Sequence, residues 1–175
     1  MTNVVPILRT QFTTTWSLLQ LHLDTLSDED CHWSPAPPEH TWSVSRNEQG
    51  RWAPDWVDTE PDPLPVATIG WLTWHIGWWW STAIAHVTDQ PVPDRDTLDW
   101  PGSAEGVRVW LADLHDQWTD FLDGASVHRM AEQATYPWPA RPDRAVADTA
   151  AWVNIELMKN TAEIGQLRLT RAVSR

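Results

Sequence analysis

The sequence reads Trp152-Val-Asn-Ile-Glu156-Leu-Met-Lys159-Asn160-Thr-Ala-Glu163-Ile-Gly-Gln166-Leu-Arg168 near its C-terminal end. This stretch has no proline and is rich in helix-forming residues, so it predicts a helix. With about 100° between successive residues, the polar side chains gather on two opposite sides of that helix. One side carries Glu156, Lys159, Asn160, Glu163 and Gln166, and the other carries Asn154, Thr161, Gly165 and Arg168.

Apolar residues occupy both flanks of the predicted helix. One flank holds Val153, Leu157 and Ile164, and the other holds Ile155, Met158, Ala162 and Leu169. We therefore expect both flanks to be covered, with one polar side facing water and the other facing the protein interior.

The direction of the Glu/Lys side decides whether this helix carries a site. If that side is solvated, Lys159 and Glu163 form an ordinary surface pair one turn apart, worth a few tenths of a kcal/mol. If it is buried, the carboxylates need a partner or a ligand, because an unpaired buried charge costs several kcal/mol. Trp152 and Leu167 lie on the carboxylate side, which favours burial and makes this row a candidate functional site.

Length and composition limit the class of protein. The 175 residues fit a single domain spanning residues 1–175. No apolar run approaches the length of a membrane span and no signal-peptide pattern is present, so we expect a cytoplasmic protein. The lone Cys31 excludes an internal disulfide framework and CxxC metal sites. With 24 acidic residues against 12 basic ones, nucleic acids and anionic membranes are not expected as partners, because phosphate binding needs a basic surface.

Tryptophan is unusually frequent, with 15 copies against one tyrosine and two phenylalanines. One interpretation is a core filled with tryptophan, and the other is a surface on which sugars or aromatic ligands stack. Residues 31–65 combine four tryptophans with seven prolines, a density that argues against both helix and sheet. We expect this segment to be a long loop held against the core by its tryptophans.

Helical spacing of apolar residues appears in three further segments, over residues 4–26, 66–88 and from Ser103 or Ala104 to Gly124. The fourth helix is expected to begin near Asp148 or Thr149, after a loop over residues 125–145, or earlier if Asp143 is its cap. Four helices with no convincing strand pattern predict an all-α four-helix bundle with long Trp/Pro-rich connecting loops.

His75 lies in the middle of the second helix, among Trp71, Trp74, Trp78 and Trp79. A histidine in such surroundings is either a core residue with a hydrogen-bond partner or a functional group, since histidine is both the commonest metal ligand and a proton shuttle near neutral pH. Ligand sites in bundles form between facing helices. His75 together with Glu156, Lys159 and Glu163 of the fourth helix is the set that fits this description.

These residues resemble the DinB-like superfamily of four-helix-bundle metalloenzymes. The resemblance is carried by Thr68-Ile-Gly-Trp-Leu-Thr-Trp-His75-Ile, by Asn160-Thr-Ala-Glu163-Ile-Gly-Gln-Leu-Arg168, by Trp42-Ser-Val and by Tyr136-Pro-Trp-Pro, and it covers nearly the whole chain. It implies a bundle that is often a homodimer. It also implies a Zn or Ni site with one histidine on the second helix and an HxxxH pair on the fourth, and thiol-dependent transferase or isomerase activity with bacillithiol, mycothiol or glutathione.

The chain departs from that pattern at the metal site. His75 matches the first ligand, but Lys159 and Glu163 stand where the two other histidines are expected. A protonated lysine has no lone pair to donate to a metal. We therefore expect the usual metal to be lost and Lys159 to replace it electrostatically, pairing with Glu163 and with Glu156. A residual metal site formed by His75, Glu156 and Glu163 is the alternative.

Two functions follow from these expectations. The first is a small-molecule transferase or isomerase, with a low-molecular-weight thiol as co-substrate, in which His75, Lys159 and Glu163 are catalytic and Trp71, Trp79, Glu156 and Asn160 line the pocket. The second is a metal-free bundle that binds a small ligand or a protein partner without catalysis.

Overall fold

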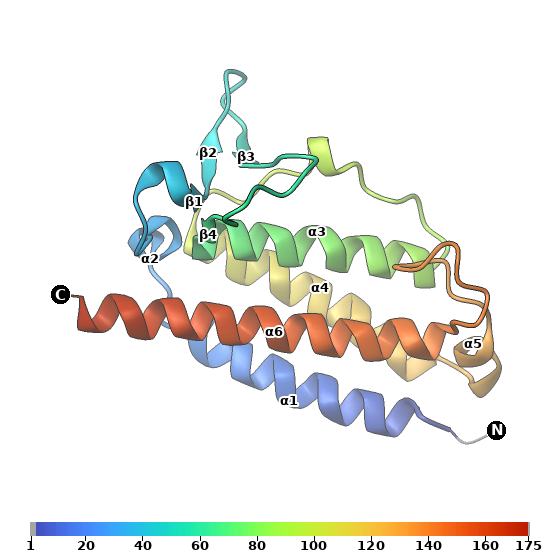
Figure 1. Cartoon of the computed structure of the whole chain (residues 1–175). Helices are drawn as coiled ribbons and strands as arrows, with labels where there is room; N and C mark the ends of the chain where they lie inside the picture. The colour runs from blue at the N-terminus through green and yellow to red at the C-terminus, as the bar shows by residue number, and fades with distance from the viewer. Residues whose placement is uncertain (1–2, 175) are drawn as a thin grey trace.

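Four long helices pack side by side in the computed structural model, which describes residues 3–174 (Figure 1). They are α1 (Val5–Leu23), α3 (Ile69–Val87), α4 (Ala104–Gly124) and α6 (Val146–Val173). α1 and α6 run in one direction and α3 and α4 in the other, so a long crossover joins α3 to the parallel α4 (Figure 1). The predicted four-helix bundle is confirmed.

The helices begin where side chains can satisfy their free N–H groups. The Thr68 hydroxyl accepts a hydrogen bond from the Trp71 amide at the start of α3, and Ser103 caps α4 in the same way. α6 begins at Val146, slightly earlier than predicted. The Asp148 carboxylate there accepts a hydrogen bond from the Ala145 amide at 2.8 Å, an arrangement in which the acidic residue lies inside the first turn.

The orientation of α6 differs from the expectation in one respect. The Val153, Leu157 and Ile164 flank is fully buried, as predicted, but Ile155 and Leu169 of the opposite flank are about two-thirds exposed. The polar sides do not divide between water and interior as expected. The side with Asn154 packs against α1, where the Asn154 amide donates to the Leu8 carbonyl at 2.9 Å. The Glu/Lys side faces a cavity between α6 and α3.

Tryptophan fills much of the core. Trp74, Trp80, Trp100 and Trp118 are almost completely buried, and their rings contact other aromatic side chains. Two of these rings donate hydrogen bonds, Trp74 to the Leu98 carbonyl at 2.9 Å and Trp100 to the Thr73 hydroxyl at 3.0 Å. The interpretation of a tryptophan-filled core therefore holds for these residues, while other tryptophans remain at the wall of the cavity.

The segment over residues 31–65 is not structureless, so the prediction of a plain loop is wrong in detail. Short elements occur in and beside it: α2 (Asp28–His32), a 3-10 turn η1 (Pro38–His40), β1 (Thr41–Trp42), β2 (Val44–Arg46), β3 (Trp52–Pro54) and β4 (Val66–Ala67). β2 and β3 form an antiparallel hairpin, and β1 pairs in parallel with β4. The hairpin turn uses the Asn47 side chain, which accepts from the Gln49 and Arg51 amides, and Gly50 at φ +75°.

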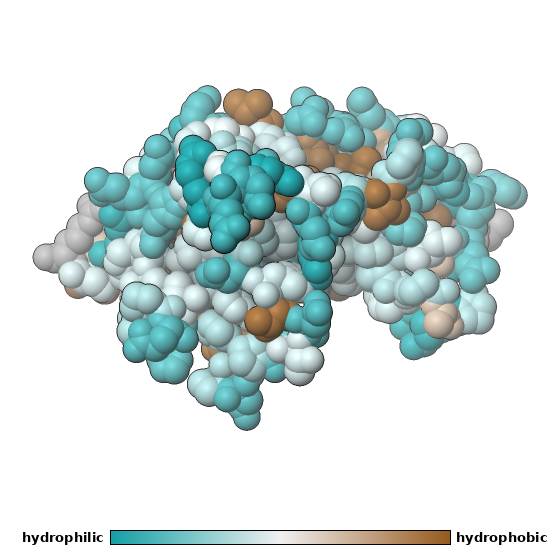
Figure 2. Space-filling model, turned by 90° about the horizontal axis from the view of Figure 1, so that it is seen from above, coloured by the Kyte–Doolittle hydropathy of each residue, from teal (hydrophilic) through white to brown (hydrophobic). Residues whose placement is uncertain are grey.

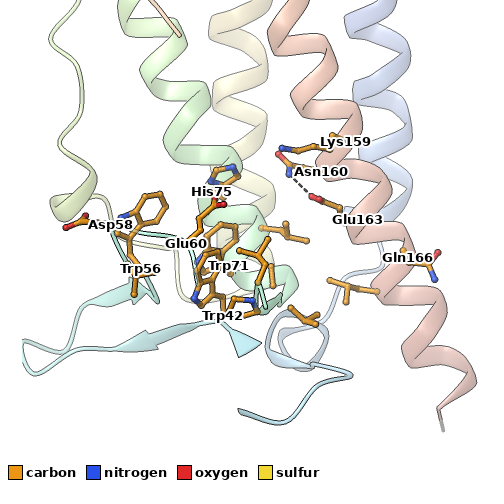
Figure 3. Close-up of a pocket in the computed structure, with 17 residues that line it drawn as sticks. Trp42, Trp56, Asp58, Glu60, Trp71, His75, Lys159, Asn160, Glu163 and Gln166 are labelled. Carbon is orange, nitrogen blue, oxygen red and sulfur yellow. Dashed lines mark hydrogen bonds between the residues drawn. The ribbon is translucent and has the colours of Figure 1, made fainter. Parts of the chain in front are cut away.

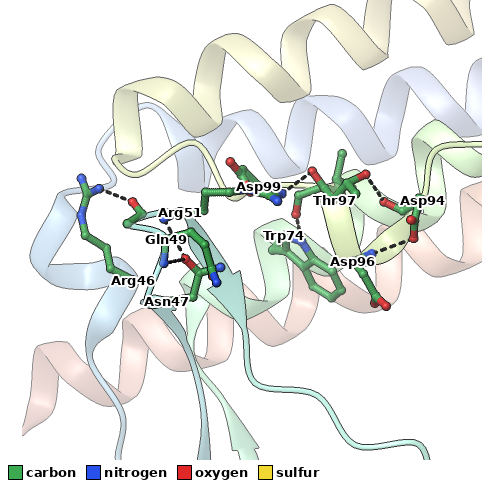
Figure 4. A network of polar contacts seen from close by, with 11 residues as sticks. Arg46, Asn47, Gln49, Arg51, Trp74, Asp94, Asp96, Thr97 and Asp99 are labelled. Atoms are coloured by element: carbon green, nitrogen blue, oxygen red, sulfur yellow. Dashed lines mark hydrogen bonds and ion pairs between the residues drawn. The ribbon is translucent and has the colours of Figure 1, made fainter.

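The hairpin is tied to the α3–α4 crossover, which contains the 3-10 turn η2 (Arg95–Thr97) (Figure 4). The Arg51 guanidinium donates to the Asp99 carboxylate at 2.8 Å and to the Thr97 carbonyl at 2.7 Å. These bonds hold the tryptophan-bearing segment over the N-terminal half of α3 (Figure 1). The tryptophans of this segment, Trp33, Trp42, Trp52 and Trp56, pack against the hydrophobic core, as predicted.

Two further features complete the fold. The short helix α5 (Val127–Ala131) lies in the segment predicted as a loop over residues 125–145.

Seen from above, the face formed by the loops is mostly hydrophilic, with hydrophobic residues in a few small groups (Figure 2). No helix within residues 3–174 has the length and apolar character needed to span a membrane.

Candidate functional site

A cavity of about 550 Å³ opens between α3, α6 and the loop that follows β3. Its volume lies within the range typical of small-molecule pockets. Aromatic and aliphatic side chains form most of the wall, including Trp42, Trp56, Trp71 and Leu72. The polar groups that reach it are His75 from α3, Lys159, Asn160, Glu163 and Gln166 from α6, and Asp58 and Glu60 from the loop (Figure 3).

His75 is held in the wall by stacking. Its ring lies nearly parallel to that of Trp71, with centroids 4.9 Å apart, and Trp42 stacks on Trp71 at 5.1 Å. The Trp71 indole N–H donates to the Asp55 carbonyl at 2.8 Å, which fixes the middle ring of this stack. The Nδ1 atom of His75 is buried and has no hydrogen-bond partner among residues 3–174.

The buried position also sets the charge of His75. Burial, and to a lesser extent the nearby Lys159 ammonium, lower the pKa of His75 to about 4. The imidazole is therefore neutral at pH 7, with a nitrogen lone pair that can accept a proton or a hydrogen bond.

Lys159 does not pair with Glu163 as expected. Its ammonium lies 2.5 Å from the Glu156 carboxylate, one turn earlier on α6. Half of the Lys159 side chain is exposed, so this pair is partly screened by water. Glu156 does not line the cavity. Glu156 affects the cavity only through its ion pair with Lys159, the one lysine in the chain, whose positive charge it balances.

Glu163 is oriented by a chain of two hydrogen bonds instead. The Trp79 indole N–H donates to the Asn160 side-chain oxygen at 3.2 Å, and the Asn160 amide donates to the Glu163 carboxylate at 2.7 Å (Figure 3). Asn160 and Trp79 are buried, so the orientation of the amide is fixed by the core. Trp79 thus orients the lining residue Asn160 through a hydrogen bond but does not itself line the cavity, in contrast to the prediction.

The donor set does not fit the metal site that the sequence resemblance implies. His75 is the only histidine among the lining residues, Lys159 is tied to Glu156, and Glu163 accepts from Asn160. The alternative site of His75, Glu156 and Glu163 is not formed either. Within residues 3–174 no group of three or more His, Cys, Asp or Glu side chains is placed to hold a metal ion. A three-ligand metal would require the ammonium and these carboxylates to rearrange.

The structure thus joins most of the predicted site residues in one cavity and adds others. Trp71, His75, Lys159, Asn160 and Glu163 all line it. The second wall, formed by Trp42 and Trp56 and by the loop residues Asp58 and Glu60, was not predicted from the sequence. The aromatic residues of the 31–65 segment were a usable signal, but nothing in their spacing indicates which of them face α6.

Comparison with known proteins places the chain in a family. The model of the DinB superfamily matches residues 11–164, which include α3, the loop between α1 and α3, and α6 as far as Ile164. A comparison with curated proteins gives no match. Since the family model covers most of the chain, this protein belongs to the DinB superfamily.

Proposed function

We propose that the chain is an enzyme that acts on a small organic molecule in the cavity between α3 and α6, as a transferase or isomerase with a low-molecular-weight thiol as co-substrate. The observation that carries this proposal is a neutral, buried His75 in the wall of a cavity of substrate size. Membership of the DinB superfamily supports the choice of thiol chemistry.

His75 is the proton acceptor in this proposal. It takes the thiol proton as the sulfur attacks an electrophilic carbon of the substrate, and it returns the proton to the product or to the leaving group. Glu163, oriented by Asn160, holds the substrate, and Lys159, whose charge Glu156 balances, is a lining residue that donates hydrogen bonds to it. None of these steps uses a metal.

Turnover of a thiol by a panel of electrophiles tests the proposal. The wild type should consume glutathione, mycothiol or bacillithiol with at least one electrophile, and His75→Ala should abolish turnover while the melting temperature stays close to that of the wild type. His86→Ala is the matched control, because His86 lies on the same helix but outside this cavity. Equal turnover by His75→Ala and the wild type would remove His75 from the mechanism.

A second candidate function is binding without catalysis, and it is favoured by one observation. The only lysine at the cavity is already paired with Glu156, and His75 with a pKa near 4 is a weak base. A binding protein is expected to show a ligand-dependent rise in melting temperature without any product. Detection of product with the same ligand would rule this function out.

A further inference from the structure

The charges at the cavity wall are unevenly balanced. Three acidic residues line it, Asp58, Glu60 and Glu163, all of them exposed, against the single basic residue Lys159. Within residues 3–174 none of these three carboxylates has an ion-pair partner, whereas Lys159 is neutralised by Glu156. Burial, which lowers the pKa of His75 to about 4, leaves this residue without charge at pH 7. The cavity therefore carries excess negative charge.

Two of the carboxylates come from different elements. Glu60 extends from the loop toward His75, and Glu163 extends from α6 into the space that the two walls enclose (Figure 3). Indole rings and aliphatic side chains line the space between them, while Glu60 and Glu163 themselves are exposed, so water screens part of their charge. A ligand that placed a negative charge between Glu60 and Glu163 would be repelled by both carboxylates.

The aromatic wall suits the same kind of ligand. Trp42 and Trp56 contribute indole surface to the lining, and the faces of indole rings attract cations, whereas the faces of Trp71 are covered by His75 and Trp42. Trp56 already makes such a contact outside the cavity, where the Arg95 guanidinium lies 4.6 Å from its ring centroid.

We propose that the cavity between α3 and α6 selects an organic cation, namely a molecule with an ammonium group on an apolar body. The ammonium binds between Glu60 and Glu163, and the apolar body lies against the tryptophans. This inference rests on the proposed function, because it names the class of substrate that the same cavity takes.

Three probes of equal length test the class of ligand. They are 3-phenylpropylammonium, 3-phenylpropanol and 3-phenylpropionate, which carry a positive, no and a negative charge on the same body. Affinities are measured at pH 7 and low salt by calorimetry on the full chain. We expect the cation to bind about tenfold more tightly than the alcohol, and the anion to bind most weakly.

Two variants assign that preference to the cavity. Glu163→Gln and Glu60→Gln should each reduce the advantage of the cation over the alcohol several-fold, while the affinity for the alcohol stays unchanged. Glu48→Gln removes the same charge from the exposed hairpin turn and should leave all three affinities unaltered. Because Glu60 lies on a loop, its variant remains informative even if Glu163→Gln fails to fold.

The outcomes separate this inference from the proposed function. Equal affinity for the three probes, preference for the anion, or no binding of any probe would each overturn selection of a cation. Thiol turnover that depends on His75 would still support the proposed function in all three cases. Conversely, tight cation binding without turnover of any electrophile would support the inference and reject the enzyme.

Discussion

At the scale of the residue, His75 is the side chain with the most demanding environment. Its ring stacks on that of Trp71 and lies tilted against that of Trp78, which leaves it only partly exposed, and no carboxylate or carbonyl among residues 3–174 hydrogen bonds to its ring. The neutral form is therefore the only one that the folded protein accommodates at low cost.

Stability is expected to fall as the pH falls because of this residue. The pKa of His75 is about 4 in the folded protein and about 6.5 in the unfolded chain, so between these values the unfolded state binds more protons. Acidification from pH 7 to pH 4 should thus cost on the order of 3 kcal/mol of unfolding free energy through His75 alone. Urea unfolding of the wild type and of His75→Gln across this range measures it.

Between pH 7 and pH 4, His75→Gln should lose less unfolding free energy than the wild type, and the difference is the contribution of His75. His22 and His86, whose pKa values burial also lowers, remain in both proteins and cancel in the comparison. If both proteins lose stability in parallel, His75 is protonated in the folded state and the assigned environment is wrong.

Metal binding is a second prediction at the residue scale. Lys159 offers an ammonium in place of a metal ligand, and the Glu163 carboxylate accepts a hydrogen bond from the Asn160 amide. We therefore propose that the purified wild type holds no stoichiometric zinc or nickel. The double variant Lys159→His/Glu163→His should gain a site, because three imidazoles would then face the cavity. Elemental analysis of protein prepared without a His tag measures both. One metal per wild-type chain, lost in His75→Ala, would show that the present residues bind metal.

At the scale of the element, the contact between α3 and α4 depends on a residue without a side chain. A Cβ atom added at Gly77 would lie 1.8 Å from the tip of the Trp110 ring, so the ring of α4 occupies the space that this glycine leaves on α3. Gly77→Ala should therefore destabilise the protein by about 1–3 kcal/mol, even though alanine is the better helix former.

The cost should be recovered when the ring is shortened. A Gly77→Ala/Trp110→Leu double variant should lose less unfolding free energy than the sum of the losses in the two single variants. Thermal or urea unfolding of all three variants measures this coupling. Gly124→Ala is the matched control, because an added Cβ there meets no atom within 4 Å. A neutral Gly77→Ala would show that α3 and α4 pack less tightly than the structure indicates.

At the scale of the whole molecule, one surface is largely apolar, with the Arg168 guanidinium at one end, where it donates to the His22 carbonyl. On α1, Ile7, Leu18 and Leu21 are exposed, and residues 10–23 include no acidic residue, lysine or arginine. On the neighbouring α6, Ile155 and Leu169 are exposed on the side adjacent to α1. Apolar surface of this kind is typical of an interface, and a chain of net charge −12 can meet a second copy here without electrostatic repulsion.

We propose that two copies associate through this α1–α6 surface. The wild type should elute as a dimer of 20.0 kDa chains in size-exclusion chromatography with light scattering, and Leu18→Glu should shift it to the monomer. Val109→Glu places the same change at an exposed position of α4 and should leave the dimer intact. A monomeric wild type at micromolar concentration would reject the proposed interface.

Much of the helical architecture follows from local patterns. The i, i+4 spacing of Leu8, Phe12 and Trp16 identifies the buried side of α1, and the threonine or serine before α3 and α4 identifies their first turns. These features depend on neighbours within a few residues, which the sequence contains directly. The same holds for His75 and the α6 row, because helical periodicity alone places them on definite sides.

The sequence by itself determined the four helices, the candidate site residues on two of them and the absence of two histidines that the DinB pattern requires. Only the tertiary structure decided which carboxylate pairs with Lys159, which flank of α6 meets water and which residues of the 31–65 segment form the second wall of the cavity. Those choices depend on contacts between residues far apart in the chain. Helical periodicity groups the residues of α6 by side but does not indicate which neighbour each side meets. Only the packing of α1, α3 and the loop against α6 decides this.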